Sequence, residues 1–202
     1  MAQTPSEKMK ETGTDRFLKD NILPSLQDFV VILSAALLLF VLLFRIVVVS
    51  GPSMNNTLLD KDYLLLLSSS VYQDPKQGDI IVASKASFEN GDPFIKRVIA
   101  LEGQEVDIDF EQGIVYVDGK ALDEPYTLTP TTRPEGVEFP LVVAEGYVFV
   151  MGDNRDRSKD SRSRDIGLVD KREILGKAIF LIFPGADEIN RQRDYSRIGV
   201  IP

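Results

Sequence analysis

The chain has 202 residues, of which 44% are hydrophobic, and its 23 Lys and Arg against 31 Asp and Glu give a formal net charge of −8. This balance excludes a general nucleic-acid binder, since such proteins present a basic face. The chain contains neither His nor Cys, which excludes catalysis by imidazole or thiol, disulfides, and metal sites built on those ligands.

A long apolar segment lies near the N-terminus. Residues 29–49 contain one charged residue, Arg45, and follow a polar region over residues 1–28. As a helix, this segment would extend about 30 Å, which matches the hydrocarbon core of a bilayer. A long Arg side chain near one end can reach the membrane interface. We therefore expect a transmembrane helix over 29–49. The alternatives are a buried helix of a soluble core and a signal peptide, whose apolar region is usually shorter.

Basic residues indicate how this segment is oriented. Lys8, Lys10, Arg16 and Lys19 precede it, whereas only Lys61 occurs in the roughly twenty residues that follow. Because basic residues concentrate on the cytoplasmic side, we expect residues 1–28 to be a cytoplasmic tail. Residues 50–202 would then form a domain on the outer side of the cell membrane, with membrane lipid as an expected partner.

Residues 50–202 are long enough for one compact domain and contain no long helical period. Their apolar segments are short, rich in Val, Ile, Phe and Tyr, and separated by turns. Asp118-Gly119 supplies the residues that a two-residue hairpin turn requires, and the Pro-rich stretch 124–140 indicates an irregular connection. The domain is therefore expected to be mainly β. The predicted strands are 63–67, 79–83, 94–101, 105–109, 113–117, 147–151 and 175–183.

Two segments of this domain carry a candidate nucleophile and a candidate base. Ser53 follows Gly51-Pro52, whose irregular backbone can present a hydroxyl, although an ordinary turn is the alternative. Lys96 shares one face of its predicted strand with apolar residues. Burial there would lower the pKa of its amine, by about 3–5 units if complete, so that it could accept a proton. A Lys that reaches water or pairs with a carboxylate is the alternative. Without His, a Ser with a neutral Lys is the simplest activated nucleophile.

A third segment, residues 152–162, reads GDNRDRSKDSR and alternates in charge after a predicted strand. A solvated loop with surface ion pairs is one interpretation. The Asp-Asn and Asp-Ser-Arg clusters can also order such a loop through hydrogen bonds between side chains and backbone. Gly152 at the end of the strand permits a close approach of the backbone.

Together, these segments resemble the bacterial type I signal peptidases. That family has a Ser-Met-x-Pro-Thr-Leu box after a membrane anchor, then a Gly-Asp-Ile-Val strand, a Lys-Arg-Val box and a Gly-Asp-Asn-Arg-x-x-Ser-x-Asp-Ser-Arg box. The corresponding segments begin here at Ser53, Gly78, Lys96 and Gly152, in the same order. The sequence departs from the pattern at Asn56, where Pro is usual, and at Glu102-Gly103-Gln104, where Pro-Gly-Asp is usual.

The resemblance implies a signal-peptidase-type β-sheet or barrel-like catalytic domain behind one membrane helix, with roles for individual residues. Ser53 would be the nucleophile of a serine endopeptidase, Lys96 its general base, and the Ser53 backbone N–H one oxyanion donor. A Ser hydroxyl two places before the nucleophile is a second donor in one branch of the family, but Gly51 stands there. Either water or another N–H replaces that donor, or the oxyanion hole is weaker. Ser158 would hold the Lys amine, and the site would be braced by Asp153, Asp160 and Arg162.

The resemblance also implies the substrate. Signal peptides with small residues of the A-x-A type would be removed from exported preproteins through an acyl-enzyme, and no cofactor or metal is required. The secretion machinery is a further expected partner. Shallow apolar pockets that admit Ala would be lined by Gly51, Pro52, Met54, Leu58, Phe94 and Ile95.

Three other functions compete with this interpretation. A catalytically silent, peptidase-like assembly factor for surface proteins would lack the catalytic pair, yet Ser53 and Lys96 are both present. A carboxylate-pair hydrolase would use Asp153 and Asp160 and would work best in acid. A self-cleaving repressor with a Ser/Lys pair would need a DNA-binding head where this chain has its apolar segment.

Overall fold

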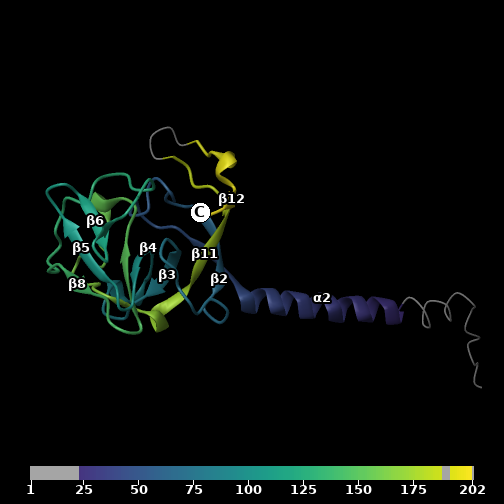
Figure 1. The fold of residues 1–202 in the computed structure, drawn as a ribbon. Helices are drawn as coiled ribbons and strands as arrows, with labels where there is room; N and C mark the ends of the chain where they lie inside the picture. Colours follow the sequence, from purple (N-terminus) through teal and green to yellow (C-terminus); the bar gives the residue numbers. More distant parts are fainter. Residues whose placement is uncertain (1–22, 188–191, 202) are drawn as a thin grey trace, which may run out of the picture. The chain divides into compact units, whose positions relative to one another are not determined.

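A computed structural model describes residues 23–187 and 192–201, which fall into two compact units that meet between Leu42 and Leu43. The described part of the first unit belongs to helix α2 (Leu23–Leu43), whose apolar side chains are largely exposed. Its stretch Ser25–Leu43 has a mean hydropathy of 2.5. By length and composition, this helix can cross a membrane (Figure 1).

The helix begins and ends about six residues earlier than the sequence indicated. It already includes residues 23–28, which were assigned to the polar tail, whereas residues 1–22 lie outside the described part. The expectation of a helix through Val49 is wrong, because Phe44–Val48 forms strand β1 and pairs with β2 (Tyr63–Ser68). Ile46, Val47 and Val48 are β-branched and favour a strand once a partner is available.

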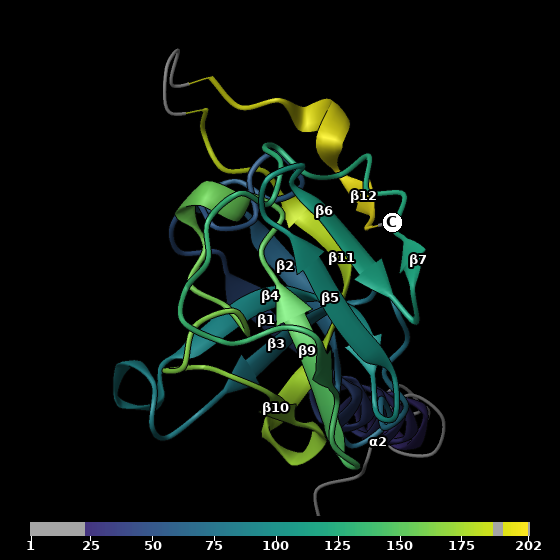
Figure 2. The same ribbon diagram turned by 60° about the vertical axis from the view of Figure 1, so that its left-hand side comes forward.

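The second unit is built from antiparallel strands (Figures 1 and 2). Among the described residues, the larger sheet has the order β1-β2-β11-β3-β4-β9-β10, with β12 also paired to β11, and the smaller sheet has the order β7-β6-β5-β8. The remaining strands are β3 (Ile80–Ser84), β4 (Pro93–Leu101), β5 (Glu105–Asp109), β6 (Ile114–Val117), β7 (Lys120–Ala121), β8 (Leu141–Val142), β9 (Tyr147–Met151), β10 (Val169–Asp170), β11 (Ile174–Phe183) and β12 (Gly199–Val200). Short 3₁₀ turns lie at Glu89–Gly91, Arg155–Arg157, Lys171–Glu173 and Tyr195–Arg197.

The expectation of a mainly β domain is confirmed, and each predicted strand is found within one residue of its expected ends. The hairpin turn is also confirmed: Val117 faces Lys120, and Asp118 and Gly119 have φ of 51° and 71°. The sequence did not predict the short strands β7, β8, β10 and β12, because two residues are too few to show an alternating pattern.

Strand β4 lies at the centre of the fold and places the candidate base. It pairs with β3 on one edge and with β9 on the other. Apolar residues of β5 and β6 pack against β4 and β9, where these strands cross in Figure 2. Residues 94–100 are consequently all buried, including the charged residues Lys96 and Arg97. Because β9 ends at Met151, opposite Arg97, the pairing with β9 does not extend to residues 93–96.

Candidate active site

The structure brings together the two residues predicted to carry the chemistry. Lys96 projects from β4, and its Nζ donates a hydrogen bond of 3.0 Å to the Ser53 Oγ, 43 positions away in the sequence. A second bond of 2.9 Å runs from the same nitrogen to the carbonyl oxygen of Ile95. Lys96 is 4% exposed, and this burial disfavours a charged ammonium. The pair can therefore serve as a hydroxyl nucleophile and an adjacent base.

Ser53 lies in a cleft with a volume of about 390 Å³. Three of the predicted pocket residues, Met54, Phe94 and Ile95, line it. Gly51 and Pro52 are not among its lining residues, and Leu58 is buried in the core beside a different groove, so a pocket role for these three stays a prediction. The other lining residues are Val47, Val48, Val49, Ser50, Val82, Asp92 and Pro93.

The backbone around Ser53 forms a hydrogen-bonded turn. Asn55 N–H donates to Pro52 O at 3.1 Å, and Leu58 N–H donates to Met54 O at 2.9 Å. Met54 and Leu58 are each 1% exposed and anchor the turn in the core. Gly51 enters the turn with φ of 84°, which favours glycine.

The donors near the nucleophile limit how an oxyanion could be bound. The Gly51 N–H already donates to the Asp60 Oδ1 at 2.8 Å. Pro52 has no N–H. Besides Ser53, Ser50 is the residue with a hydroxyl that lines the cleft.

The loop after β9 holds the turn in place. Asn154 N–H donates to Ser53 O at 3.0 Å, and its side-chain Nδ2 donates to Pro52 O at 3.0 Å. Gly152 lies so close that a Cβ there would be 2.5 Å from Ser53 O and would overlap the Ser158 side chain. A glycine is therefore required at this contact.

Asp153 connects three segments around the candidate site. Its carboxylate is buried and accepts hydrogen bonds from the Arg97 Nε and Nη2 at 2.9 and 2.8 Å. It also accepts a bond of 2.5 Å from the Thr57 hydroxyl, at the far end of the Ser53 turn. The Arg97 guanidinium stacks over the ring of Tyr126 at 4.0 Å. This network couples β4 to the nucleophile turn.

Asp160 and Arg162 form a second buried pair within the loop. The Arg162 Nε and Nη2 each lie 2.9 Å from the Asp160 carboxylate, which also accepts the Gly152 N–H at 3.0 Å. Burial of Arg162 disfavours its charge, but the hydrogen bonds to Asp160 outweigh this and raise the pKa of the guanidinium. The pair thus shapes the loop that touches Ser53.

Asp153 and Asp160 are each bound by their own arginine. This arrangement does not favour the carboxylate-pair alternative. Among the described residues, no group of three or more carboxylates is placed to hold a metal ion.

Ser158 does not make the predicted contact. Its Oγ is buried against Gly152 and has no hydrogen-bond partner in the described part of the chain, so the expected bond to the Lys96 amine is absent. That amine is directed instead to Ser53 and to the Ile95 carbonyl.

Three residues that brace the site, Thr57, Arg97 and Asn154, were not predicted from the sequence. Each lies inside a segment that carried the resemblance, next to or near a residue that was chosen. Their position in those motifs was therefore the available signal.

Comparisons with known proteins support a family assignment. Residues 23–183 match the family model described as signal peptidase, peptidase S26. Signal peptidase I of Bacillus licheniformis is 34% identical over 87% of this chain and 95% of its own. Probable signal peptidase I-1 of Synechocystis is 40% identical over 85% of each chain. The crystal structure of a signal peptidase I from Enterococcus faecalis is 33% identical and covers 52% of this chain and 96% of its own, with a TM-score of 0.43. The matched residues and the two curated relatives show that the chain belongs to the signal peptidase S26 family and is a serine endopeptidase.

Proposed function

We propose that this chain is a membrane-anchored peptidase that removes signal peptides from exported preproteins with Ser53 as nucleophile and Lys96 as general base. The observation that carries the proposal is the 3.0 Å contact between the Ser53 Oγ and the Lys96 Nζ, in a chain with no His or Cys. Family membership supports signal-peptide removal.

In the first step, neutral Lys96 accepts the hydroxyl proton while the Ser53 Oγ attacks the scissile carbonyl. The protonated amine then gives this proton to the leaving nitrogen as the C–N bond breaks, which leaves an acyl-enzyme. Lys96 next removes a proton from a water molecule, which attacks the ester, and returns this proton to the Ser53 Oγ as the ester C–O bond breaks. No metal or cofactor takes part in these steps.

The oxyanion would be held by the Ser53 backbone N–H and one further donor. The Gly51 N–H is engaged by Asp60, and Pro52 has none, which supports the Ser50 hydroxyl in the same cleft as that donor. Such donors are worth about 3–4 kcal/mol of barrier height.

The cleft suits an extended peptide with small side chains. Residues 93–96 of β4 lie beyond the end of the β9 pairing, so a substrate can pair there as an added strand. Met54, Phe94 and Ile95 would bound the pocket for the residue before the scissile bond. These features support cleavage after residues of the A-x-A type.

Helix α2 would anchor the enzyme, with the N-terminus in the cytoplasm and the peptidase domain on the outer side. Anchoring keeps the enzyme in the plane where signal peptides reside and raises their effective concentration. Membrane lipid and the secretion machinery are therefore proposed partners.

Cleavage of a preprotein by the detergent-solubilised full chain tests the proposal. Ser53→Ala and Lys96→Ala should each abolish cleavage while far-UV circular dichroism and thermal unfolding stay unchanged. Replacing the Ala before the scissile bond with Phe should also stop cleavage. Turnover by either variant would refute the assigned pair, and no turnover by the wild type would favour a silent assembly factor.

A further inference from the structure

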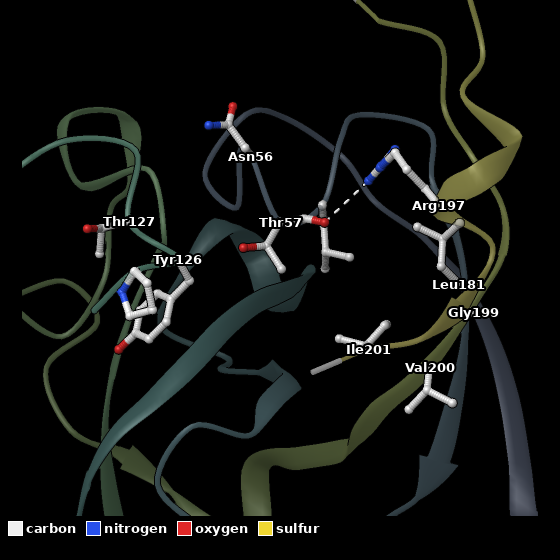
Figure 3. A pocket seen from close by; sticks show the side chains of 11 residues that line it. Asn56, Thr57, Tyr126, Thr127, Leu181, Arg197, Gly199, Val200 and Ile201 are labelled. Carbon is white, nitrogen blue, oxygen red and sulfur yellow. Dashed lines mark hydrogen bonds between the residues drawn. The ribbon is translucent and has the colours of Figure 1, made fainter. Parts of the chain in front are cut away.

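A second groove, with a volume of about 390 Å³, lies on the peptidase domain and shares no lining residue with the Ser53 cleft. Residues 56–58, 125–127 and 199–201, which are far apart in the sequence, bound it. Figure 3 shows Tyr126 and Thr127 on one side of the groove and Val200 and Ile201 on the other.

The floor of this groove is apolar. Leu58, Leu181 and Ile201 line it and are at most 9% exposed. The Tyr126 ring forms a wall and is held from behind by the Arg97 guanidinium. Val200, on the opposite wall, is 81% exposed. The groove can therefore bury apolar side chains of a ligand.

One wall is also a free strand edge. Val200 faces Phe180 of β11, and Ile201 N–H donates to Ile179 O at 3.1 Å. Because backbone groups alternate between the two edges of an antiparallel strand, the N–H and C=O of Val200 point away from β11. Neither has a hydrogen-bond partner among the described residues. An extended peptide would satisfy both groups, whereas a lipid chain would leave them unpaired.

The charge in the groove is already neutralised. Arg197 donates to the Asp62 carboxylate at 3.0 and 2.7 Å, and also to Thr57 O at 3.2 Å, the bond dashed in Figure 3. Hence the lining selects an apolar extended chain rather than an anion.

The groove begins where the nucleophile turn ends. Ser53 lines the cleft and Asn56 lines the groove, three residues further along the same turn, so their Cα atoms are at most about 11 Å apart. An extended chain covers this distance in about three or four residues, at roughly 3.3 Å each. A peptide that leaves the Ser53 cleft can therefore enter the groove shortly after the scissile bond.

We propose that this groove binds the first residues of the mature protein, downstream of the scissile bond, as an extended strand against β12. The inference rests on the proposed function, because it concerns the same substrate on the other side of the cleavage point. Contacts in the groove would lower KM as the mature segment of the substrate becomes longer. The Ser53 cleft, in contrast, would bind the end of the signal peptide.

Two synthetic peptides with the same signal and cleavage region test this, one ending about two residues after the scissile bond and one about eight. With the full chain in detergent, we expect the longer peptide to have a KM roughly tenfold lower, as one or two strand hydrogen bonds would produce. Val200→Pro, which removes the free N–H, should reduce this ratio to about twofold or less. N-methylation of alternate downstream amides in the longer peptide should do the same with the wild-type enzyme.

Val142→Pro is the matched control. Val142 faces Glu105 at the edge of β8, and Val143 N–H donates to Gln104 O, so its free N–H repeats the geometry of Val200 in the other sheet. This variant should keep the wild-type ratio.

Equal KM values for the two peptides with the wild-type enzyme would overturn the proposal, whatever the effect of N-methylation. The proposal would also be overturned if folded Val200→Pro kept the wild-type ratio of KM values between the two peptides. The same holds if the variant only lost self-association of the enzyme, because the groove would then bind a second copy of the chain. If Val200→Pro does not fold, the KM of the N-methylated longer peptide with the wild-type enzyme tests the proposal instead, and an unchanged KM would overturn it. Normal cleavage of the short peptide keeps the proposed function intact in each of these cases, whereas no cleavage of either peptide refutes that function first.

Discussion

The contact between Gly152 and the nucleophile turn allows a sharp test of how the site is positioned. In Gly152→Ala, the new Cβ would lie 2.5 Å from the Ser53 carbonyl oxygen and would overlap the Ser158 side chain. To reach 3.0 Å, the practical lower limit for such contacts, the carbonyl must move by about 0.5 Å. The Ser53 turn would shift with its carbonyl, which alters the 3.0 Å contact between the Ser53 Oγ and the Lys96 Nζ.

The expected cost follows from that displacement. A misplacement on the order of 1 Å can lower a rate about 100-fold, so half of it should reduce kcat roughly tenfold. Overpacking at a buried contact should also lower the free energy of unfolding by about 1–3 kcal/mol. Single-turnover cleavage of a preprotein peptide, with the folded fraction measured by urea titration, separates the two effects.

Gly176→Ala is the control, because its Cβ would overlap the Leu67 carbonyl oxygen within the larger sheet. We expect a comparable loss of stability but a nearly normal kcat for the folded enzyme. If Gly152→Ala cleaved as fast as the wild type, or if Gly176→Ala lost as much kcat, the positioning argument would be refuted.

Three further predictions concern charge and hydrogen bonding. Cleavage should slow as the pH falls from about 9 to 5, because Lys96 must be neutral to accept the Ser53 proton; a flat pH–rate profile would contradict this. Thr57→Val removes the hydroxyl that bonds the Asp153 carboxylate and should lower kcat about tenfold with little change in KM, as seen in initial rates; an unchanged kcat would exclude a positioning role. Burial of Asp79 disfavours its charge, but hydrogen bonds, with that from Lys177 the largest, outweigh burial and lower the pKa of its carboxyl. Its folded carboxylate therefore stabilises the protein above the ordinary Asp pKa and loses this contribution as the pH falls through the lowered value. Asp79→Asn should accordingly weaken the dependence of urea stability on pH below about 4, and an unaltered dependence would refute that assignment.

Most strands of the β domain could be predicted from the sequence. Strands such as 105–109, where Val and Ile alternate with acidic residues, and 147–151, which is a run of apolar residues, are bounded by turn residues, and these local preferences agree with the final pairing. The Asp118-Gly119 turn was equally local, since positive φ is a property of those two residues. The strand conformation of residues 44–48 could not be predicted, because an apolar run is compatible with both a membrane helix and a strand, and pairing with β2 decides between them.

The pairing of Ser53 with Lys96 was expected from the absence of His and from the resemblance, and its catalytic role remains a prediction. Bracing by Asn154 and Thr57 was not expected, because each bond depends on where the loop after β9 meets the nucleophile turn. The expected bond of Ser158 to Lys96 failed for the same reason: a shared motif does not specify the side-chain direction that packing against Gly152 imposes.

The sequence by itself determined which chemistry is open to this protein, since composition excludes imidazole and thiol and local patterns define the strands and the apolar helix. Only the tertiary structure decided which groups meet across 43 or more positions, which N–H groups are already engaged, and where a second groove opens. The physical reason is that strand preferences act between neighbours in the chain, whereas a hydrogen bond between distant residues exists only after the sheets have packed.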